Sequence, residues 1–497
     1  MEEIRLGTLR LVVEHRVPSG PTLRVRDASG RECLRFDCFE PGAHFHLDPE
    51  GADTVAPIPV GRDSIDWVLE ELGRDLAGWL ARAGTAAATP LDPATARSAL
   101  ACAERAMRHP PLDLDALALD RLRARTGEKW RVYPDDVLPL WVADMDYPVA
   151  EPIRRRLHRA VELSDLGYPM HPRPTGLPEL FTERAERCFG WRVDPRCVEL
   201  LADVVQGMYV AIEAWSERGQ GAVVQTPIYP PFLGAVRNTG RVLVENRLVQ
   251  GPTGFEIDFD RLRAAISRDT RLLLLCNPHN PTGCVFQRDE LERLAEIVLA
   301  HDLVVVADEL HGELTYPGHG FVPFATLGSE VEARTFTLTA ASKAFNIAGM
   351  RCAVGVFGSE ELRKRFLEVP RHLRGGLGAL GIEATRAAWL HGDPWLEQVL
   401  AHLAANRERV AAFVAERLPG VVHQPPRATY FAWLDCRALG LEPSPFEFFL
   451  ERAKVGLSDG RTFGAAGEGF VRLNFATSRP ILDEALERMA RAVERRP

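Results

Sequence analysis

The sequence predicts an α/β fold in which helices cover a mostly parallel sheet, preceded by a small α+β domain. From about residue 112 onward, short runs rich in Val and Leu alternate with amphipathic helical patterns. Runs that are apolar on both faces are typical of strands buried in a parallel sheet. The stretch before residue 85 instead alternates in short strand-like runs and ends in one amphipathic helix. At roughly 150 residues per domain, a chain of 497 residues has room for about three compact units.

The composition excludes several classes of protein. Hydrophobic residues make up 46% and charged residues 26%, which is typical of a globular protein and excludes disorder as the main state. The net charge of -9 disfavours a generic nucleic-acid binder and favours work on small molecules. No apolar stretch approaches the ~20 residues that cross a bilayer, so no membrane partner is expected. The N-terminus lacks the features of a secretory signal, and we expect a cytoplasmic protein.

The first 84 residues predict a small α+β domain of unknown function. Strands are expected at 9–13, 23–26 and 33–36, and the turn signal of residues 27–30 joins the last two as a hairpin. A helix follows, capped by Asp63 or Ser64 and stopped near Gly84. Its apolar face is formed by Ile65, Val68, Leu69, Leu72, Leu76, Trp79 and Leu80.

Two cysteines and two histidines in this region raise the question of a metal. Thiolate and imidazole are zinc ligands, but the C-x4-C-x5-H-x-H spacing of Cys33, Cys38, His44 and His46 matches no usual zinc knuckle. We therefore predict a cysteine-bearing strand beside a polar loop, and no metal. The nine cysteines include no C-x-x-C pair and are odd in number, which favours reduced thiols.

Residues 85–111 are predicted to be a linker that contains one short helix, because small residues and prolines bound a helical stretch. The remaining chain, 112–497, holds the α/β region. Its expected buried strands are 222–224, 242–244, 272–275, 304–306 and 353–356. A final strand and helix are expected over 469–479 and 482–493.

Lysine is scarce, which narrows any lysine chemistry. The chain has only Lys129, Lys343, Lys364 and Lys454. Residues 335–350 contain no other charge, so Lys343 lies in an apolar setting. Desolvation lowers the pKa of an ammonium group, as a nucleophilic or Schiff-base amine requires. The alternative is a lone lysine whose ammonium reaches solvent from an apolar turn.

An ordered set of motifs surrounds this lysine. Asn277-Pro278-His279-Asn280-Pro281-Thr282-Gly283 follows one buried strand, and Asp308 ends the next. Lys343 follows Asp308 by 35 residues, and Arg351 comes eight later. Over residues 112–497 the chain resembles the fold-type I pyridoxal-phosphate enzymes, the aspartate aminotransferase superfamily. The resemblance implies a cofactor domain at about 155–385 and a small domain built from 112–154 and 386–497.

The resemblance also implies roles for individual residues around pyridoxal 5'-phosphate. Asp308 would keep the ring nitrogen protonated, Asn280 would bind the ring 3-oxygen, and Tyr229 would stack on the ring. His311 stands where aminotransferases often carry a tyrosine. The phosphate would be bound by Val204 and Val205 at a helix start, by Ser342 and by Arg351. Ala340 replaces an expected phosphate-binding serine, so Thr339 is a candidate substitute. Each residue also has an ordinary structural explanation, such as a turn, a cap or a core position.

Two further positions concern the substrate and the subunit partner. Arg472, within an apolar strand pattern, matches the arginine that binds the substrate α-carboxylate. Tyr168 matches a tyrosine that reaches the phosphate of the neighbouring subunit, which implies a homodimer with shared active sites.

Three segments narrow the reaction. Residues 139–146, 338–349 and 458–464 resemble the cystathionine β-lyase-like carbon–sulfur lyases of the MalY/PatB type, and they add Trp141 and Ala143 as substrate-side candidates. The implied reaction cleaves cystathionine or another cysteine S-conjugate to a thiol, pyruvate and ammonia. Lys343 would be the general base that removes the substrate α-proton.

Two alternatives remain open from the sequence. An aminotransferase would need a keto-acid acceptor and would release no net pyruvate and ammonia. A regulatory fusion would use the N-terminal domain to bind DNA or a partner. Residues 1–83 hold 10 arginines against 15 acidic residues and show no helix-turn-helix, which disfavours DNA binding.

Overall fold

The computed structural model describes residues 1–16, 20–85, 92–169, 175–251 and 254–495. The chain forms two compact units. The first contains residues 1–112 together with the short segments 150–167 and 391–395, and the second contains the remainder. Part of the predicted linker, residues 86–91, lies outside the described residues.

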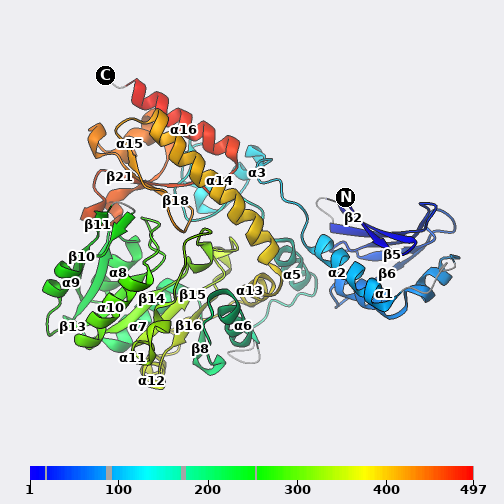
Figure 1. Ribbon diagram of the computed structural model, residues 1–497, viewed down its shortest axis with the longest axis horizontal. Helices are drawn as coiled ribbons and strands as arrows, with labels where there is room; N and C mark the ends of the chain where they lie inside the picture. Colours follow the sequence, from blue (N-terminus) through cyan, green and yellow to red (C-terminus); the bar gives the residue numbers. More distant parts are fainter. Residues whose placement is uncertain (17–19, 86–91, 170–174, 252–253, 496–497) are drawn as a thin grey trace. The chain divides into compact units, whose positions relative to one another are not determined.

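The first unit contains a six-stranded antiparallel sheet whose strands are adjacent in chain order (Figure 1). The predicted hairpin is confirmed, because the turn at 27–30 joins β3 to β4. The strands are β1 (Glu2–Leu6), β2 (Leu9–Arg16), β3 (Gly20–Arg26), β4 (Glu32–Asp37), β5 (His44–Leu47) and β6 (Thr54–Pro57).

Two helices, α1 (Ser64–Arg82) and α2 (Pro93–Arg108), contribute to the hydrophobic core of this sheet. Asp63 caps α1 by accepting hydrogen bonds from the amides of Ile65 and Asp66, as the sequence predicts. The structure differs at the predicted boundary of residue 84. Leu100, Ala103 and other apolar residues of α2 belong to the same hydrophobic cluster as α1, so the compact unit continues to Leu112.

The predicted polar loop around His44 and His46 is wrong, because these residues form strand β5. Phe45 and Leu47 alternate with the two histidines and pack against the hydrophobic cluster. This two-residue period turns His44 and His46 to the other face of the sheet. A strand with only two apolar residues shows too short an alternation to be distinguished from a loop in the sequence.

Helix α5 (Glu151–Glu162) belongs to the first unit and contains a buried arginine. Arg155 is 2% exposed and donates to the carbonyl oxygen of Cys38 at 2.8 Å and to the carboxylate of Glu40 at 2.7 Å. It also donates to the hydroxyl of Ser64 at 2.8 Å. Glu40 thus supplies the opposite charge that a buried guanidinium needs, and the Nη donors are satisfied.

The second unit is built on a seven-stranded mixed sheet (Figure 1). Its first five strands run parallel, and β16 is antiparallel to both of its neighbours. All five strands predicted from the sequence are present and two more, β15 and β8, join them, but the predicted burial of 242–244 is wrong because β10 is an edge strand with Val242 exposed. In sheet order they are β10 (Val242–Arg247), β9 (Gly221–Thr226), β13 (Thr270–Cys276), β14 (Val304–Asp308), β15 (Thr335–Thr339), β16 (Ala353–Phe357) and β8 (Val198–Leu201).

Helices cover both faces of this sheet, as the α/β prediction requires. One hydrophobic cluster joins the sheet to α7 (Val204–Trp215), α8 (Pro230–Asn238) and α12 (Glu360–Glu368). The other joins it to α9 (Phe259–Ala265) and α10 (Arg288–Ala300). Further helices of this region are α6 (Leu177–Phe189) and α13 (Ala379–His391).

The remaining part of the second unit contains a four-stranded sheet and long helices. The strands, in sheet order, are β17 (Val422–His423), β18 (Phe431–Asp435), β21 (Phe470–Asn474) and β20 (Ser458–Asp459). The longer helices are α14 (Asp393–Arg417) and α16 (Arg479–Glu494). The expected final strand and helix are thus confirmed. A short parallel pair joins β7 (Leu138–Pro139) to β19 (Val455–Gly456).

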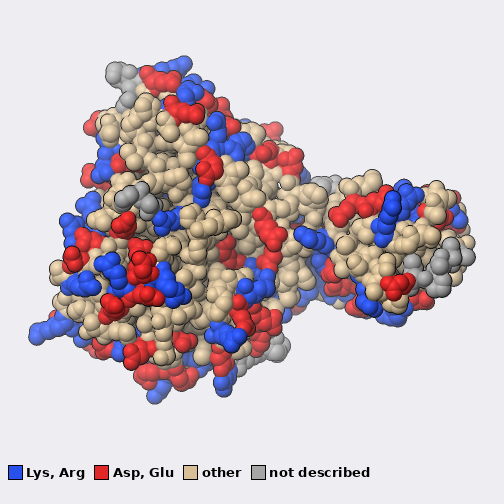
Figure 2. Space-filling view, viewed as in Figure 1, with Lys and Arg blue, Asp and Glu red and all other residues tan. Residues whose placement is uncertain are grey.

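Figure 2 shows acidic and basic side chains interspersed over the visible face of the molecule. Among the described residues, every helix is too short or too polar to cross a membrane.

Candidate active site

A cavity of about 210 Å³ opens at the carboxyl ends of the central parallel strands. Strand β13 ends at Cys276 and β14 ends at Asp308, and these two residues are directly paired. Ligands of open α/β sheets bind at this edge. The cavity is lined by ten of the predicted site residues: Ala143, Val204, Val205, Tyr229, Asn280, Asp308, His311, Ser342, Lys343 and Arg351.

Lys343 follows β15 in a tight turn, and its amine faces the cavity. Its Nζ donates to the carbonyl oxygen of Ala143 at 2.9 Å. Burial lowers the pKa of Lys343, while the carboxylate of Asp144 opposes that shift. The turn is apolar, with Ala341, Ala344 and Phe345 buried. Such surroundings favour an amine that is more easily deprotonated than an ordinary lysine.

Asp308 lies at the floor of the cavity and is 7% exposed. Burial raises its pKa to about 7, against the effect of the Leu310 amide, which donates to its Oδ1 at 3.1 Å. The neighbouring Glu309 points elsewhere, because its Oε1 accepts a hydrogen bond from the amide of Phe324 at 2.7 Å. Asp308 is therefore a buried carboxyl group that a cationic partner would stabilise in its charged form.

Arg472 extends from β21 toward the same region. Its Nη1 donates to the Oδ1 of Asn280 at 2.8 Å, and its Nη2 donates to the carbonyl oxygen of Trp141 at 2.9 Å. The guanidinium also lies over the ring of Phe431, 4.1 Å from its centroid. Its Nε is buried without a hydrogen-bond partner among the described residues. Arg472 is therefore a buried cation to which no carboxylate of the described ranges is bonded, which suits the binding of an anion.

The segment 141–145 is held in place through its backbone carbonyl groups. Arg472 and Ser458 donate to the carbonyl of Trp141, and Lys343 and Tyr430 donate to that of Ala143. Asn474 bridges the carbonyls on either side of Ala143, and Asn346 bonds both the amide and the carbonyl of Met145. Segment 141–145 carries part of the sequence resemblance to the carbon–sulfur lyases. Lys343 and Arg472 both donate hydrogen bonds to its backbone.

The start of helix α7 also lines the cavity. Asp203 caps this helix by accepting from the amide of Gln206 at 2.8 Å. The amides of Val204 and Val205 come first in the helix, where backbone N–H groups lack partners within the helix and attract anions. Arg351 pairs with the Oδ2 of Asp203 at 2.5 Å, and Ser342 also lines the cavity.

His311 and Tyr229 complete the predicted set. Burial lowers the pKa of His311 to about 3, so its imidazole is neutral at physiological pH. Its Nδ1 is buried and has no hydrogen-bond partner among the described residues. Tyr229 caps α8, and its amide donates to the carbonyl of Asn280 at 3.0 Å. An unpartnered buried nitrogen beside a cavity indicates a site for a polar ligand.

Four sequence-based candidates do not line the cavity, and one of them is Arg472, which donates to the lining residue Asn280. Tyr168 is fully exposed, and its predicted role in a neighbouring subunit stays a prediction. Trp141 contributes its carbonyl rather than its ring, since its Nε1 donates to the carbonyl of Lys129 at 3.3 Å. Thr339 is absent from the lining residues, whereas Ala340 is among them.

Sequence reasoning missed several residues of the site. Asp203 was missed because an aspartate that caps a helix is common in any sequence. Its ion pair with Arg351 places it beside the cavity. Tyr430 and Asn474 act through the backbone of segment 141–145, which lies about 290 to 330 residues away in the chain. No local pattern signals such long-range bonds.

Two family models match the chain. Residues 136–489 match the model "Aminotransferase class I and II", and residues 3–107 match "Domain of unknown function (DUF7700)". The chain is 35% identical to cystathionine beta-lyase PatB of Bacillus subtilis, over 74% of this chain and 95% of that protein. It is 36% identical to cystathionine beta-lyase of Corynebacterium glutamicum, over 75% and 98%. The crystal structure of the PLP-bound C-S lyase from Staphylococcus hominis matches with a TM-score of 0.73 and 27% identity, over 77% and 99%.

Proposed function

Because the chain belongs to the aminotransferase class I and II family, we propose that it is a pyridoxal-phosphate-dependent carbon–sulfur β-lyase of the MalY/PatB type. Its substrate is cystathionine or another cysteine S-conjugate, which it cleaves to a thiol, pyruvate and ammonia. One observation carries the proposal: Lys343 donates to the backbone of segment 141–145, which Arg472 also binds.

The residues of the cavity fit pyridoxal 5'-phosphate, which is the cofactor of this enzyme. The free amides at the start of α7, with Ser342 and Arg351, would bind its phosphate. Asp308, with its pKa raised toward neutrality by burial, would gain the cationic partner that its carboxylate lacks. The amine of Lys343 would hold the aldehyde carbon.

When bound, pyridoxal phosphate withdraws electrons from the substrate α-carbon and so makes its proton more acidic. Asp308 supports this property by keeping a proton on the ring nitrogen. Lys343 removes the α-proton through its Nζ, and burial assists by lowering the pKa of that amine. The Ala143 carbonyl, 2.9 Å from Nζ, accepts a hydrogen bond from the amine and orients it.

Arg472 binds the α-carboxylate of the substrate. Its guanidinium presents paired N–H donors in a plane, which match the two oxygens of a carboxylate. In this structure those donors bond Asn280 and the Trp141 carbonyl. These bonds hold the arginine in one orientation before the substrate arrives, which limits the ordering that binding must bring about.

We further propose that the enzyme works as a cytoplasmic homodimer. The fully exposed Tyr168 supports a partner subunit, because its predicted role requires the cavity of another chain. The six buried cysteines are free thiols, which supports a reducing compartment: Cys33, Cys38, Cys276, Cys284, Cys352 and Cys436.

The test is pyruvate release by the purified, cofactor-loaded protein with no keto acid added. We expect equimolar pyruvate and thiol from L-cystathionine or from a simple cysteine S-conjugate, and no product with the Lys343→Ala variant. Lys364→Ala is the matched control, because Lys364 lies on the exposed side of helix α12 and should leave turnover unchanged.

Amino-group transfer that requires an added keto acid, without release of thiol, would contradict the lyase proposal and identify an aminotransferase instead. Release of pyruvate from S-conjugates but not from cystathionine would retain the reaction and change the substrate.

A further inference from the structure

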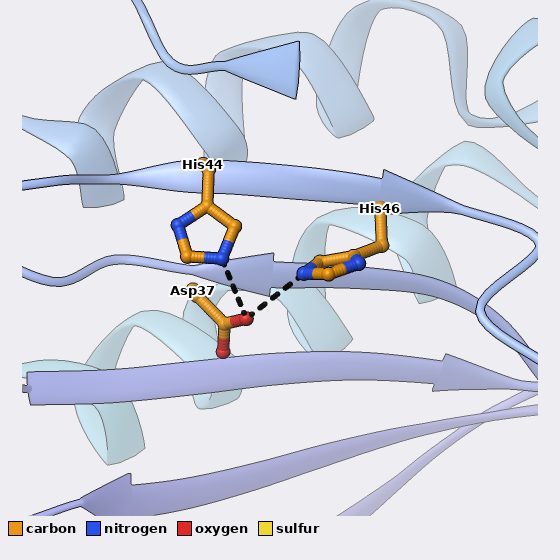
Figure 3. Close-up of side chains that lie close together, drawn as sticks. All are labelled: Asp37, His44 and His46. Carbon is orange, nitrogen blue, oxygen red and sulfur yellow. Dashed lines mark ion pairs between the residues drawn. The ribbon is translucent and has the colours of Figure 1, made fainter. Parts of the chain in front are cut away.

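Three metal-ligating side chains meet on the N-terminal sheet (Figure 3). Asp37 ends β4, and His44 and His46 lie on the adjacent strand β5, where Asp37 is the direct partner of His44. Their ligand atoms all lie within 4.8 Å of one another. Asp37 and His46 are buried, whereas the His44 side chain is 32% exposed. We call these three residues the Asp37 cluster.

The distances within the Asp37 cluster match those of a bound metal ion. The Nε2 atoms of both histidines lie 3.4 Å from the Oδ2 of Asp37. Ligands on a tetrahedral ion with bonds of roughly 2.0–2.1 Å are about 3.4 Å apart. The separation is longer than a good hydrogen bond between nitrogen and a carboxylate oxygen.

The other polar atoms of the Asp37 cluster are already bonded. His46 Nδ1 lies 2.6 Å from the Oδ1 of Asp53, and His44 Nδ1 lies 2.9 Å from the Gly42 carbonyl oxygen. Both partners are acceptors to which Nδ1 can donate a hydrogen bond, and Nε2 is the ring atom directed at Asp37 Oδ2. Thr22 donates to the Oδ1 of Asp37 at 2.6 Å, so Oδ2 is the oxygen that faces the two histidines.

From this arrangement we propose that Asp37, His44 and His46 bind a divalent transition-metal ion such as Zn²⁺. Two imidazole nitrogens and one carboxylate oxygen form a common ligand set for such ions. The bonds from Nδ1 to a carboxylate and to a carbonyl are those that orient metal-binding histidines. Exposure of His44 leaves a fourth coordination position open to water or to a small ligand. The proposal departs from the sequence-based prediction of no metal.

Arg35 is a nearby group that opposes a cation. Its Nη2 lies 3.0 Å from both ring nitrogens of His46, and its Nε lies 3.3 Å from the Oδ2 of Asp37. A bound metal ion would replace the guanidinium as the cation beside Asp37 and His46. Arg35 has a second acceptor, because Glu32 Oε1 is buried without a hydrogen-bond partner and lies 3.7 Å from its Nη1. On metal binding we expect the guanidinium to turn toward Glu32, whose other oxygen pairs with Arg24.

The experiment titrates Zn²⁺ into the full-length, cofactor-loaded protein after treatment with a chelator, followed by calorimetry. We expect one ion per chain. Asp37→Asn keeps the acceptor for Thr22, and His44→Ala alters a partly exposed side chain, so both variants should fold; each should weaken binding at least about 100-fold. Asp53→Asn should weaken it about 10-fold to 100-fold, because Asp53 only orients His46.

Controls separate this site from other metal binders in the chain. His301→Ala removes an exposed histidine of the second unit and should leave the affinity unchanged. Co²⁺ in place of Zn²⁺ should give visible absorption without the charge-transfer bands of cysteine ligands. The absorbance of the bound cofactor should not change on titration, and Zn²⁺ should raise the melting temperature of the wild type but not of His44→Ala.

Absence of binding at micromolar Zn²⁺ would overturn the proposal and leave the Asp37 cluster as histidines paired directly with carboxylates. Binding that persists unchanged in both Asp37→Asn and His44→Ala, or cobalt spectra with cysteine bands, would overturn it as well.

Discussion

The cofactor cavity and the Asp37 cluster control their ionisable groups in different ways. In the cavity, burial dominates: it lowers the pKa values of Lys343 and His311 and raises that of Asp308. In the Asp37 cluster, each ionisable side chain is instead bonded to a named partner such as Asp53 or Thr22. Burial shifts pKa values and so favours proton transfer. Fixed hydrogen-bond partners instead orient ligand atoms toward an ion.

The largest effect should come from the lysine. Replacing Lys343 with Ala removes both the attachment point and the base, so turnover should fall by about 10⁴-fold or more. The same variant should lose the visible absorbance of bound cofactor while its Zn²⁺ titration stays like that of the wild type. Measurable pyruvate release by Lys343→Ala would show that the cavity does not depend on this amine.

A buried ion pair in the first unit gives the next largest effect. Arg155→Ala leaves Glu40, whose side chain is 9% exposed, without its cation. Breaking a buried pair by removing one partner costs about 3–5 kcal/mol. Hydrogen exchange of the β3–β5 amides should therefore accelerate.

The adjacent arginine provides a matched control. Arg154 pairs with Glu151 at 2.6 Å, but its side chain is 29% exposed. Surface pairs contribute about 1 kcal/mol or less, so Arg154→Ala should leave exchange of the same amides nearly unchanged. Equal effects of the two variants would mean that Arg155 does not stabilise this unit through its buried contacts.

Substrate binding should respond to Arg472. Arg472→Ala removes the cation for the α-carboxylate, and kcat/KM should fall about 10²-fold to 10³-fold, the order expected when a buried charged hydrogen-bond partner is truncated. Cofactor content should be retained, which distinguishes this variant from Lys343→Ala. Steady-state kinetics with a cysteine S-conjugate give the ratio; an unchanged kcat/KM would remove Arg472 from the substrate site.

The two regions also differ in how far the sequence predicts them. Asn280, Asp308 and Lys343 occur in short motifs after buried strands, so their order along the chain already indicates one cavity. The Asp37 cluster depends on register: Asp37 meets His44 because β4 and β5 pair antiparallel with that alignment. A shift of one residue would turn the histidines to the opposite face, and no local motif fixes that choice.

The same reasoning explains the remaining differences between prediction and structure. Helix α2 belongs to the N-terminal domain because its Leu100 and Ala103 lie in the hydrophobic core of that domain. The small and polar residues around the helix resemble a linker in the sequence. The bonds from Tyr430 and Asn474 to segment 141–145 join distant parts of the chain. Local patterns predict elements well and predict contacts between them only where a family resemblance supplies the geometry.

The smallest predicted effect is a pH dependence that sharpens the role of burial. After cofactor removal, folded Asp308 has a pKa of about 7, against 3.8 as its ordinary value. The folded state then binds a proton that the unfolded chain has released, so stability falls as pH rises from about 4 to 7. Between pH 5 and pH 8 the contribution of Asp308 to the free energy of unfolding falls by about 2–3 kcal/mol, at 1.36 kcal/mol per pKa unit.

In the cofactor-free protein, Asp308→Asn should abolish the loss of stability that Asp308 causes between pH 5 and pH 8, as measured by denaturant titrations at these two pH values. With cofactor bound, the ring nitrogen supplies a cation to Asp308, so the wild type should no longer show this loss of stability. Glu309, whose pKa burial raises to about 8, lies outside the lining residues of the cavity, and Glu309→Gln should therefore reduce the dependence equally with and without cofactor. If Asp308→Asn behaves like Glu309→Gln in both states, Asp308 does not face the ring nitrogen, and burial alone accounts for its raised pKa.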